Sequence, residues 1–433
     1  MGMGVADAVM AGRVGAVDLA GVTLGGNVYW PASMLAAGMI MAVTPSVSQL
    51  HGAGRQAEAG EVVRQAVWIA LVGGILMVVF MNTIEPLYYW IGIDPLAIPI
   101  AVAYLHALSF SVIQLMLFFC LRYLCEGLSW TQPAMIIAML ALGIKIYLND
   151  LFIHGGTFGP WTVPRMGGVG CGWATAVVIN FQLFAMALVV AFSRAKVAGF
   201  YARFSWPRLA EIRRLVRLGL PIGLTTSLEM AVFSGATLVA GTIGVQAVAA
   251  HQIAMNVGGL TFMLPLAIGM GAAIRVGFNV GAGDLDAARR SGWVAICVAS
   301  SFALLAGVVV FLGRDFIASL YSKEAAVVGL AAQLMLFVAF FQLFDASQTT
   351  GIGALRGYKD TRTPMLVAMV AYWVIGFPVA CLLCFGWLGA PELGLWGIWT
   401  GLTLGLGVAA FALIARYHWL SRQPARVLQL AAH

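Results

Sequence analysis

The sequence predicts an all-helical membrane protein that crosses the bilayer many times, and two observations carry this prediction. First, 61% of the 433 residues are hydrophobic and 9% are charged, whereas a soluble chain has about 25% charged residues. Second, the apolar residues lie in long unbroken runs, without the polar residue at every second position that the strands of a porin show. The composition therefore excludes a water-soluble domain, a disordered chain and a disulfide scaffold.

Twelve apolar runs follow one another along the chain. They fall near 1–12, 19–50, 65–82, 97–121, 131–153, 168–192, 215–240, 248–280, 292–312, 325–355, 364–388 and 393–415. A helix needs about 20 residues to cross a hydrocarbon core of about 30 Å. At about 1.5 Å per residue, the run 1–12 reaches only about 18 Å. We therefore expect twelve helices, of which the first is incomplete because the chain is truncated or its start was assigned too late.

The loops between these runs alternate in charge. One set carries 19 of the 24 Lys and Arg residues, clustered in 55–64, 122, 194–217, 275–290, 356–362 and 416–426. Basic residues accumulate on the cytoplasmic side of membrane proteins. We therefore expect these loops and the C-terminus to be cytoplasmic, and the dispersed charge does not favour a nucleic-acid partner.

An internal repeat relates the two halves of the sequence. A shift of 229 positions aligns residues 11–54 with 240–283 without a gap and gives 13 identities over 44 positions. A weaker echo places Glu126-Gly127 opposite Arg356-Gly357. Repeats of half the chain with equal orientation are a transporter architecture. The repeat predicts an N-terminal six-helix lobe over 1–193, a cytoplasmic linker over 194–214 and a C-terminal six-helix lobe over 215–433.

Five polar residues within the apolar runs are candidate site residues. Asp7, Lys145, Glu229 and Asp345 are ionisable, and Asn149 shares a helix face with Lys145 four residues earlier. A charge at the bilayer centre costs about 2.5–3.5 kcal/mol on insertion scales. An ionisable residue at this depth is therefore first interpreted as a functional residue. Glu229 and Asp345 could form one exchange site that holds a proton or a cation. The alternative is a structural role, such as a Lys145–Asp7 ion pair that holds the first lobe together.

Other motifs point away from enzymes and metalloproteins. Cys381 and Cys384 have the spacing of a metal or redox pair, but they lie inside a run without His or acidic neighbours and are better explained as small apolar residues. No phosphate-binding GxxxxGK[ST] loop is present. We expect no cofactor, and no metal beyond a possible Na⁺ at Glu229 and Asp345.

Five motifs together resemble a known family. They are Asp7-Ala-Val-Met-Ala-Gly-Arg-Val-Gly15, Gln49-Leu-His-Gly-Ala-Gly-Arg55, Gly167-Gly-Val-Gly-Cys-Gly172, Ala249-Ala-His-Gln252 and Gly353-Ala-Leu-Arg-Gly-Tyr-Lys-Asp-Thr361. In order and spacing they are similar to NorM-type members of the multidrug and toxic compound extrusion (MATE) family. The similarity extends over essentially the whole chain.

This resemblance implies a twelve-helix fold of two lobes and export of organic cations in exchange for H⁺ or Na⁺. It places Asp7 at the cation-coupling acid of the first helix and Asn149 at a polar position of the first-lobe site. Glu229 and Asp345 match the second-lobe acids implicated in binding cations and drugs. Lys145 departs from the pattern, since the family carries asparagine there. A lysine beside Asp7 would compete with Na⁺, which favours coupling to protons.

The resemblance also implies the setting of the protein. We expect a monomeric secondary transporter, not an enzyme, in the bacterial inner membrane, with drug resistance as its outcome. The nearest alternative is a flippase for a lipid-linked saccharide, which would need a cationic cavity, whereas this chain offers three acids against one lysine. A passive channel and an intramembrane enzyme are more distant alternatives.

Overall fold

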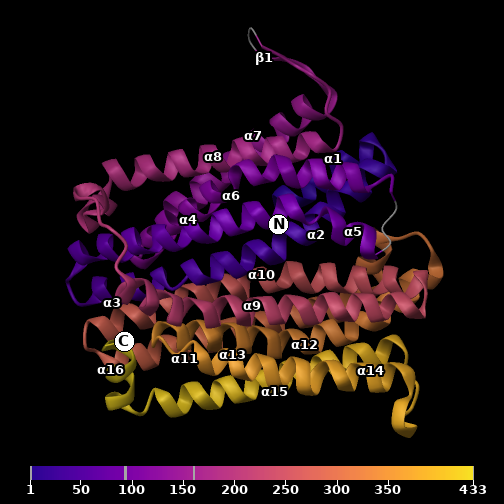
Figure 1. Cartoon of the computed structure of the whole chain (residues 1–433). Coiled ribbons are helices and arrows are strands. Elements are labelled where there is room, and N and C mark those ends of the chain that lie inside the picture. Colours follow the sequence, from indigo (N-terminus) through magenta and orange to yellow (C-terminus); the bar gives the residue numbers. More distant parts are fainter. Residues whose placement is uncertain (1, 92–94, 159–160, 433) are drawn as a thin grey trace. The chain divides into compact units, whose positions relative to one another are not determined.

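The computed structural model describes residues 2–91, 95–158 and 161–432, and nearly all of them are helical (Figure 1). In this part of the chain, eleven helices are long and apolar enough to cross a membrane. They correspond to eleven of the twelve apolar runs. The run at the N-terminus forms α1 (Gly2–Val14), whose 13 residues reach about 20 Å and fall short of the hydrocarbon core. The prediction of an all-helical, polytopic membrane fold is confirmed.

The helices divide into two compact units. The first contains residues 1–47 and 55–223, and the second contains residues 48–54 and 224–433. The first unit is built from α2 (Ala16–Ile40), the first half of α3 (Val43–Gly52), α4 (Ala59–Thr83), α5 (Glu85–Ile91), α6 (Ile98–Gly127), α7 (Gln132–His154), α8 (Val169–Phe192) and the first part of α9 (Leu209–Ile243), together with α1. Within it, α6 packs against α2, α4 and α8, and α1 packs against α2 and α7.

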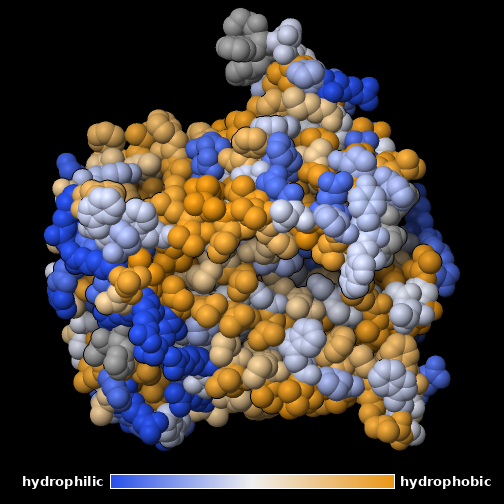
Figure 2. Space-filling view, in the orientation of Figure 1, coloured by the Kyte–Doolittle hydropathy of each residue, from blue (hydrophilic) through white to orange (hydrophobic). Residues whose placement is uncertain are grey.

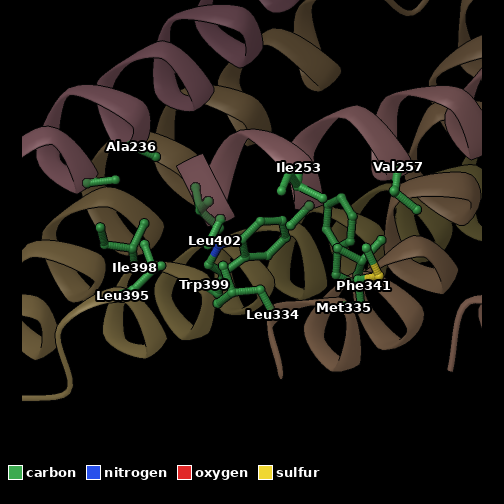
Figure 3. Close-up of a cluster of buried hydrophobic side chains, with 14 of the residues drawn as sticks. Ala236, Ile253, Val257, Leu334, Met335, Phe341, Leu395, Ile398, Trp399 and Leu402 are labelled. Atoms are coloured by element: carbon green, nitrogen blue, oxygen red, sulfur yellow. The ribbon is translucent and has the colours of Figure 1, made fainter. Parts of the chain in front are cut away.

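The second unit repeats this plan. It contains the rest of α9, α10 (Val245–Gly281), α11 (Leu285–Tyr321), α12 (Ala325–Gly357), α13 (Arg362–Ala368), α14 (Phe377–Phe385), α15 (Leu395–Leu420) and α16 (Pro424–Ala432). In this unit α12 packs against α10, α11 and α15. Its core includes Trp399, whose indole lies among Leu334, Ile253 and Leu402 in Figure 3 and meets the Phe341 ring edge-on at 5.8 Å.

Three features of the fold were not predicted. A short hairpin pairs β1 (Gly156–Phe158) with β2 (Trp161–Val163) in the loop before α8. The run 364–388 is a helix interrupted by a π-helical segment, η4 (Met369–Gly376). The expected linker begins with two 3₁₀ turns, η2 (Arg194–Ala198) and η3 (Phe200–Ala202), and it docks on α4, where the buried Arg64 guanidinium donates to Ser205 Oγ at 2.9 Å.

The surface agrees with a protein that is surrounded by lipid. Figure 2 shows hydrophobic residues over the sides of the helices, whereas many hydrophilic residues gather near the helix ends. Leu76, Phe192, Leu312 and Phe411 are each more than 60% exposed. A soluble monomer does not expose so much contiguous apolar surface.

Candidate functional sites

Asp7 is the centre of a buried polar cluster in the first unit. Its carboxylate is 7% exposed and accepts hydrogen bonds at 2.9 Å from Lys145 Nζ on one oxygen and from Asn149 Nδ2 on the other. Lys145 and Asn149 lie one turn apart on α7, so both side chains reach α1 from the same face. The structure thus brings together three of the five residues that the sequence singled out.

Lys145 is fully engaged in this cluster. Its side chain is 1% exposed, and its ammonium group forms a salt bridge with Asp7 at 2.9 Å. It also donates to Thr175 Oγ1, and Thr175 donates to the Cys171 carbonyl at 2.7 Å. An ion pair removed from water persists only where further hydrogen bonds satisfy both partners, as they do here. The ammonium therefore occupies the place beside Asp7 where a mobile cation would bind.

One acceptor in the cluster has no partner in the described structure. Asn149 Oδ1 is buried without a hydrogen bond, while Asn149 Nδ2 is used by Asp7. A buried acceptor without a donor costs free energy that a water or a protonated group can recover. This atom marks a place next to Asp7 that can receive a proton donor.

The second cluster joins three elements of the second unit around Glu229. The Glu229 carboxylate, on α9, accepts a hydrogen bond at 2.7 Å from Gln348 Nε2 on α12. The hydroxyl of Tyr372, on η4, donates to Gln348 Oε1 and lies 3.5 Å from Glu229 Oε1. The π-helical segment therefore carries one member of the site, in keeping with the frequent occurrence of π-bulges at functional positions.

Asp345 belongs to the same cluster. It lies on α12, one turn before Gln348, and is 7% exposed. Its carboxyl group is close enough to Glu229 for the two charges to repel one another. The positive charge of Arg356 acts electrostatically on the Glu229 carboxylate, so the two acids share the influence of one arginine. This cluster is therefore a concentration of negative charge that can attract a cation.

Neutral polar residues complete both clusters, and sequence reasoning missed them. Thr175, Gln348 and Tyr372 hold the acidic and basic groups in place. A hydroxyl or amide inside an apolar run is common in membrane helices because it can bond within or between helices. In the sequence, only their place at the same depth in the membrane as the acidic residues could have distinguished them from the other polar residues of the helices.

The described residues contain no group of three or more His, Cys, Asp or Glu side chains that could hold a metal ion. Cys384 is buried and Cys381 partly buried, and both are free thiols. His251 is buried between helices, with Nε2 3.2 Å from Thr237 Oγ1 and its ring edge-on to Trp399, as expected for a residue that joins helices.

Comparisons with known proteins agree with this architecture. The multidrug resistance protein MdtK of Yersinia pseudotuberculosis is 39% identical over 434 residues, which cover 100% of this chain and 94% of MdtK. The crystal structure of the eukaryotic MATE transporter AtDTX14 superposes with a TM-score of 0.88 at 21% identity, covering 99% of this chain and 94% of that one. The Vibrio cholerae MATE transporter VcmN in its bent form gives a TM-score of 0.85 at 18% identity, covering 98% and 93%.

The two structural matches have low sequence identity and support the fold. The relationship to MdtK, by contrast, runs through the full sequence. The MatE family itself matches residues 1–151 and 221–382, which include Asp7, Lys145 and Asn149 of the first cluster and all the named residues of the second. This chain therefore belongs to the MatE family of membrane transporters.

Proposed function

We propose that this transporter exports organic cations from the bacterial cytoplasm, across the inner membrane and in exchange for protons. The observation that carries the proposal is the cluster of Glu229 and Asp345. Glu229 accepts a hydrogen bond from Gln348, to which Tyr372 donates in turn, and both acids lie inside membrane-length helices. Two carboxyl groups that share the electrostatic influence of one arginine, Arg356, keep an excess of negative charge that a cation from outside the protein can neutralise. The similarity to a multidrug resistance protein supports drugs as the cargo.

Exchange follows from the competition of drug and proton for the same carboxylates. In an outward-open state, protons neutralise Glu229 and Asp345 and weaken their attraction for a bound cation, which then leaves. In an inward-open state, the protons leave and the restored charge attracts the next cation. Each proton that enters gains about 2.3 kcal/mol per 100 mV of membrane potential. No ATP site or cofactor is required for this cycle.

In the first unit, the position of Lys145 favours coupling to protons over coupling to Na⁺. Its ammonium already neutralises Asp7 at 2.9 Å, so a sodium ion there would meet a like charge at contact distance. In the second unit, Glu229 and Asp345 offer a possible Na⁺ site, but their described partners hold only one oxygen of Glu229. We therefore favour coupling to protons. We further propose that the transporter acts as a monomer, with its basic loops and its C-terminus in the cytoplasm.

The test is efflux of a fluorescent cationic dye from cells of a pump-deficient host, with the Na⁺ and pH gradients varied separately. We expect export that collapses with the pH gradient and ignores Na⁺. The variant Lys145→Asn opens the place beside Asp7, so its export should become sensitive to Na⁺. Export that requires Na⁺ in the unaltered protein would overturn proton coupling. An inserted protein that exports no dye but moves a lipid-linked saccharide would favour a flippase.

A further inference from the structure

An open groove lies between α10 and α11 in the second unit, away from both acidic clusters. Its volume is about 560 Å³, within the range of pockets that hold small ligands. Arg275 of α10 and Arg290 of α11 both line it, and both are exposed. Among the described residues, neither arginine has an Asp or Glu partner within 4 Å (the other exposed arginines of the structure include paired ones, such as Arg55). The Arg275 guanidinium lies over the Phe278 ring at 5.9 Å from its centroid, so the groove offers two positive charges that no acidic side chain within 4 Å neutralises.

The polarity of the groove changes along the helices. Arg275 lies six residues before the end of α10 and Arg290 five residues after the start of α11, so both are about 7–9 Å from the turn that joins these helices. Ile268 and Val298 line the same groove thirteen residues from these helix ends, about 20 Å away. The groove thus passes from charged walls near the turn to apolar walls deeper in the membrane.

This gradient coincides with the layers of a bilayer. The headgroup layers add about 5–8 Å on each side of a hydrocarbon core of about 30 Å. The 37 residues of α10 extend over about 55 Å and pass through both layers. In a bilayer centred on α10, the arginines would lie at headgroup depth, whereas Val294 and Val298, which are 62% and 52% exposed, would face acyl chains.

Hydrogen bonds of Asn279 and Ser291 form the floor of the groove. Asn279 is 7% exposed, and its Nδ2 donates to Ser291 Oγ at 2.9 Å, which ties α10 to α11. Ser291 in turn donates to the Ala287 carbonyl at 2.7 Å. Gly271 lines the deeper part, and a side chain there would meet no atom within 4 Å of its Cβ. The groove is therefore an open trough between two helices that a hydrogen bond joins.

We propose that this groove binds an anionic glycerophospholipid from the leaflet on the side of the α10–α11 turn. Arg275 and Arg290 hold the phosphate, and the acyl chains lie against Val294 and Val298. Basic pockets between membrane helices are established binding sites for anionic headgroups. The proposal depends only on the membrane setting and not on the efflux cycle.

The test measures lipid binding to the purified full-length protein in detergent by native mass spectrometry and thermal shift. The probes are dioleoyl phosphatidylglycerol, dioleoyl phosphatidylcholine and glycerol phosphate, which has the charge without the acyl chains. We expect phosphatidylglycerol to bind and raise the melting temperature, and the other two probes to bind at least about tenfold more weakly. Equal binding of phosphatidylcholine would overturn the role of charge, and equal binding of glycerol phosphate would show a site for free phosphates instead.

Two pairs of variants locate the lipid. Arg275→Gln with Arg290→Gln should lose phosphatidylglycerol binding, whereas Arg422→Gln, an exposed arginine after α15, should keep it. Gly271→Leu fills the apolar part of the groove without a clash and should also weaken binding. Gly329→Leu, at another open position in the second unit, is its control. Binding that survives both groove changes, or that falls equally in the controls, would place the lipid elsewhere and overturn the proposal.

Discussion

At the scale of single residues, the main feature is how this chain places charge inside a membrane. Asp7 and Lys145 neutralise one another at 2.9 Å in the first unit. In the second unit, Glu229 accepts a hydrogen bond from the neutral amide of Gln348, and Asp345 lies one turn before Gln348 on α12. We propose that the first arrangement is closed to a further cation and that the second is open to one.

The first prediction concerns the stability of the Asp7–Lys145 pair. Lys145→Met leaves the buried Asp7 carboxylate without its cation, and loss of one partner of a buried pair costs about 3–5 kcal/mol. We expect a clear fall in the melting temperature of the purified protein. Adding Asp7→Asn removes the stranded charge, so the double variant should melt above Lys145→Met. A double variant that melts as low as the sum of both single changes would contradict this pairing.

The second prediction concerns Asp345. Asp345→Asn removes one of the two negative charges available to a cation, so dye efflux should fall by roughly tenfold or more, equal to at least about 1.4 kcal/mol. Insertion should be unchanged because asparagine has the same size and no charge to desolvate. Asp315→Asn is the matched control, since its side chain is 79% exposed. Retained efflux in Asp345→Asn, at normal protein levels on an immunoblot, would remove Asp345 from the site.

The sequence reveals charged site residues more readily than their neutral partners. Asp7, Lys145, Glu229 and Asp345 stand out because an ionisable group in an apolar run is costly and rare. The contact of Asp7 with Lys145 was considered from sequence as a structural alternative, and the structure contains it. Tyr372 could not be found because its approach to Glu229 depends on the local π-helical turn of η4. A periodicity of 3.6 residues does not reveal such a turn.

At the scale of elements, the internal repeat is visible in the turns and helix contacts. The turns after α6 and α12 each have a left-handed residue two positions after the last glycine, with φ 60° at Ser129 and 62° at Lys359. The helix breaks at Gly15 and Gly244 also correspond under the shift of 229 positions. The sequence predicted these helices well because long apolar runs indicate segments that lie in the lipid bilayer. It missed α16 and the β1–β2 hairpin because these elements are too short for a membrane-length run.

The third prediction uses this equivalence. A side chain at Gly127 would approach Val47 Cβ to 2.7 Å, and one at Gly357 would approach Val276 Cβ to 2.7 Å, so both helices need glycine for close packing. We expect Gly127→Val and Gly357→Val to lower the melting temperature by similar amounts, as overpacking costs about 1–3 kcal/mol. Gly329→Ala, at an open position, should instead stabilise α12 slightly. A large effect at only one of the two glycines would show that the halves no longer pack alike.

At the scale of the whole molecule, charge and hydropathy determine how the chain lies in the membrane. Eleven described helices are long enough to cross it, and most of the 24 basic residues lie in alternate loops. The loop that contains the β1–β2 hairpin belongs to the sparsely charged set, with Arg165 as its basic residue. Retention of Lys and Arg on the cytoplasmic side would place this hairpin outside and the C-terminus inside.

The fourth prediction tests this orientation. Green fluorescent protein fused after His433 should fluoresce, because it folds in the cytoplasm, and alkaline phosphatase inserted in the β1–β2 loop should be active, because it folds outside. Alkaline phosphatase inserted before Leu209, in the basic segment between α8 and α9, should be inactive and is the control. The inverted result at all three positions would reverse the cytoplasmic side. The direction of exchange would not change with the orientation, because the proton gradient and the membrane potential, which is negative inside, drive protons in and cations out in either case.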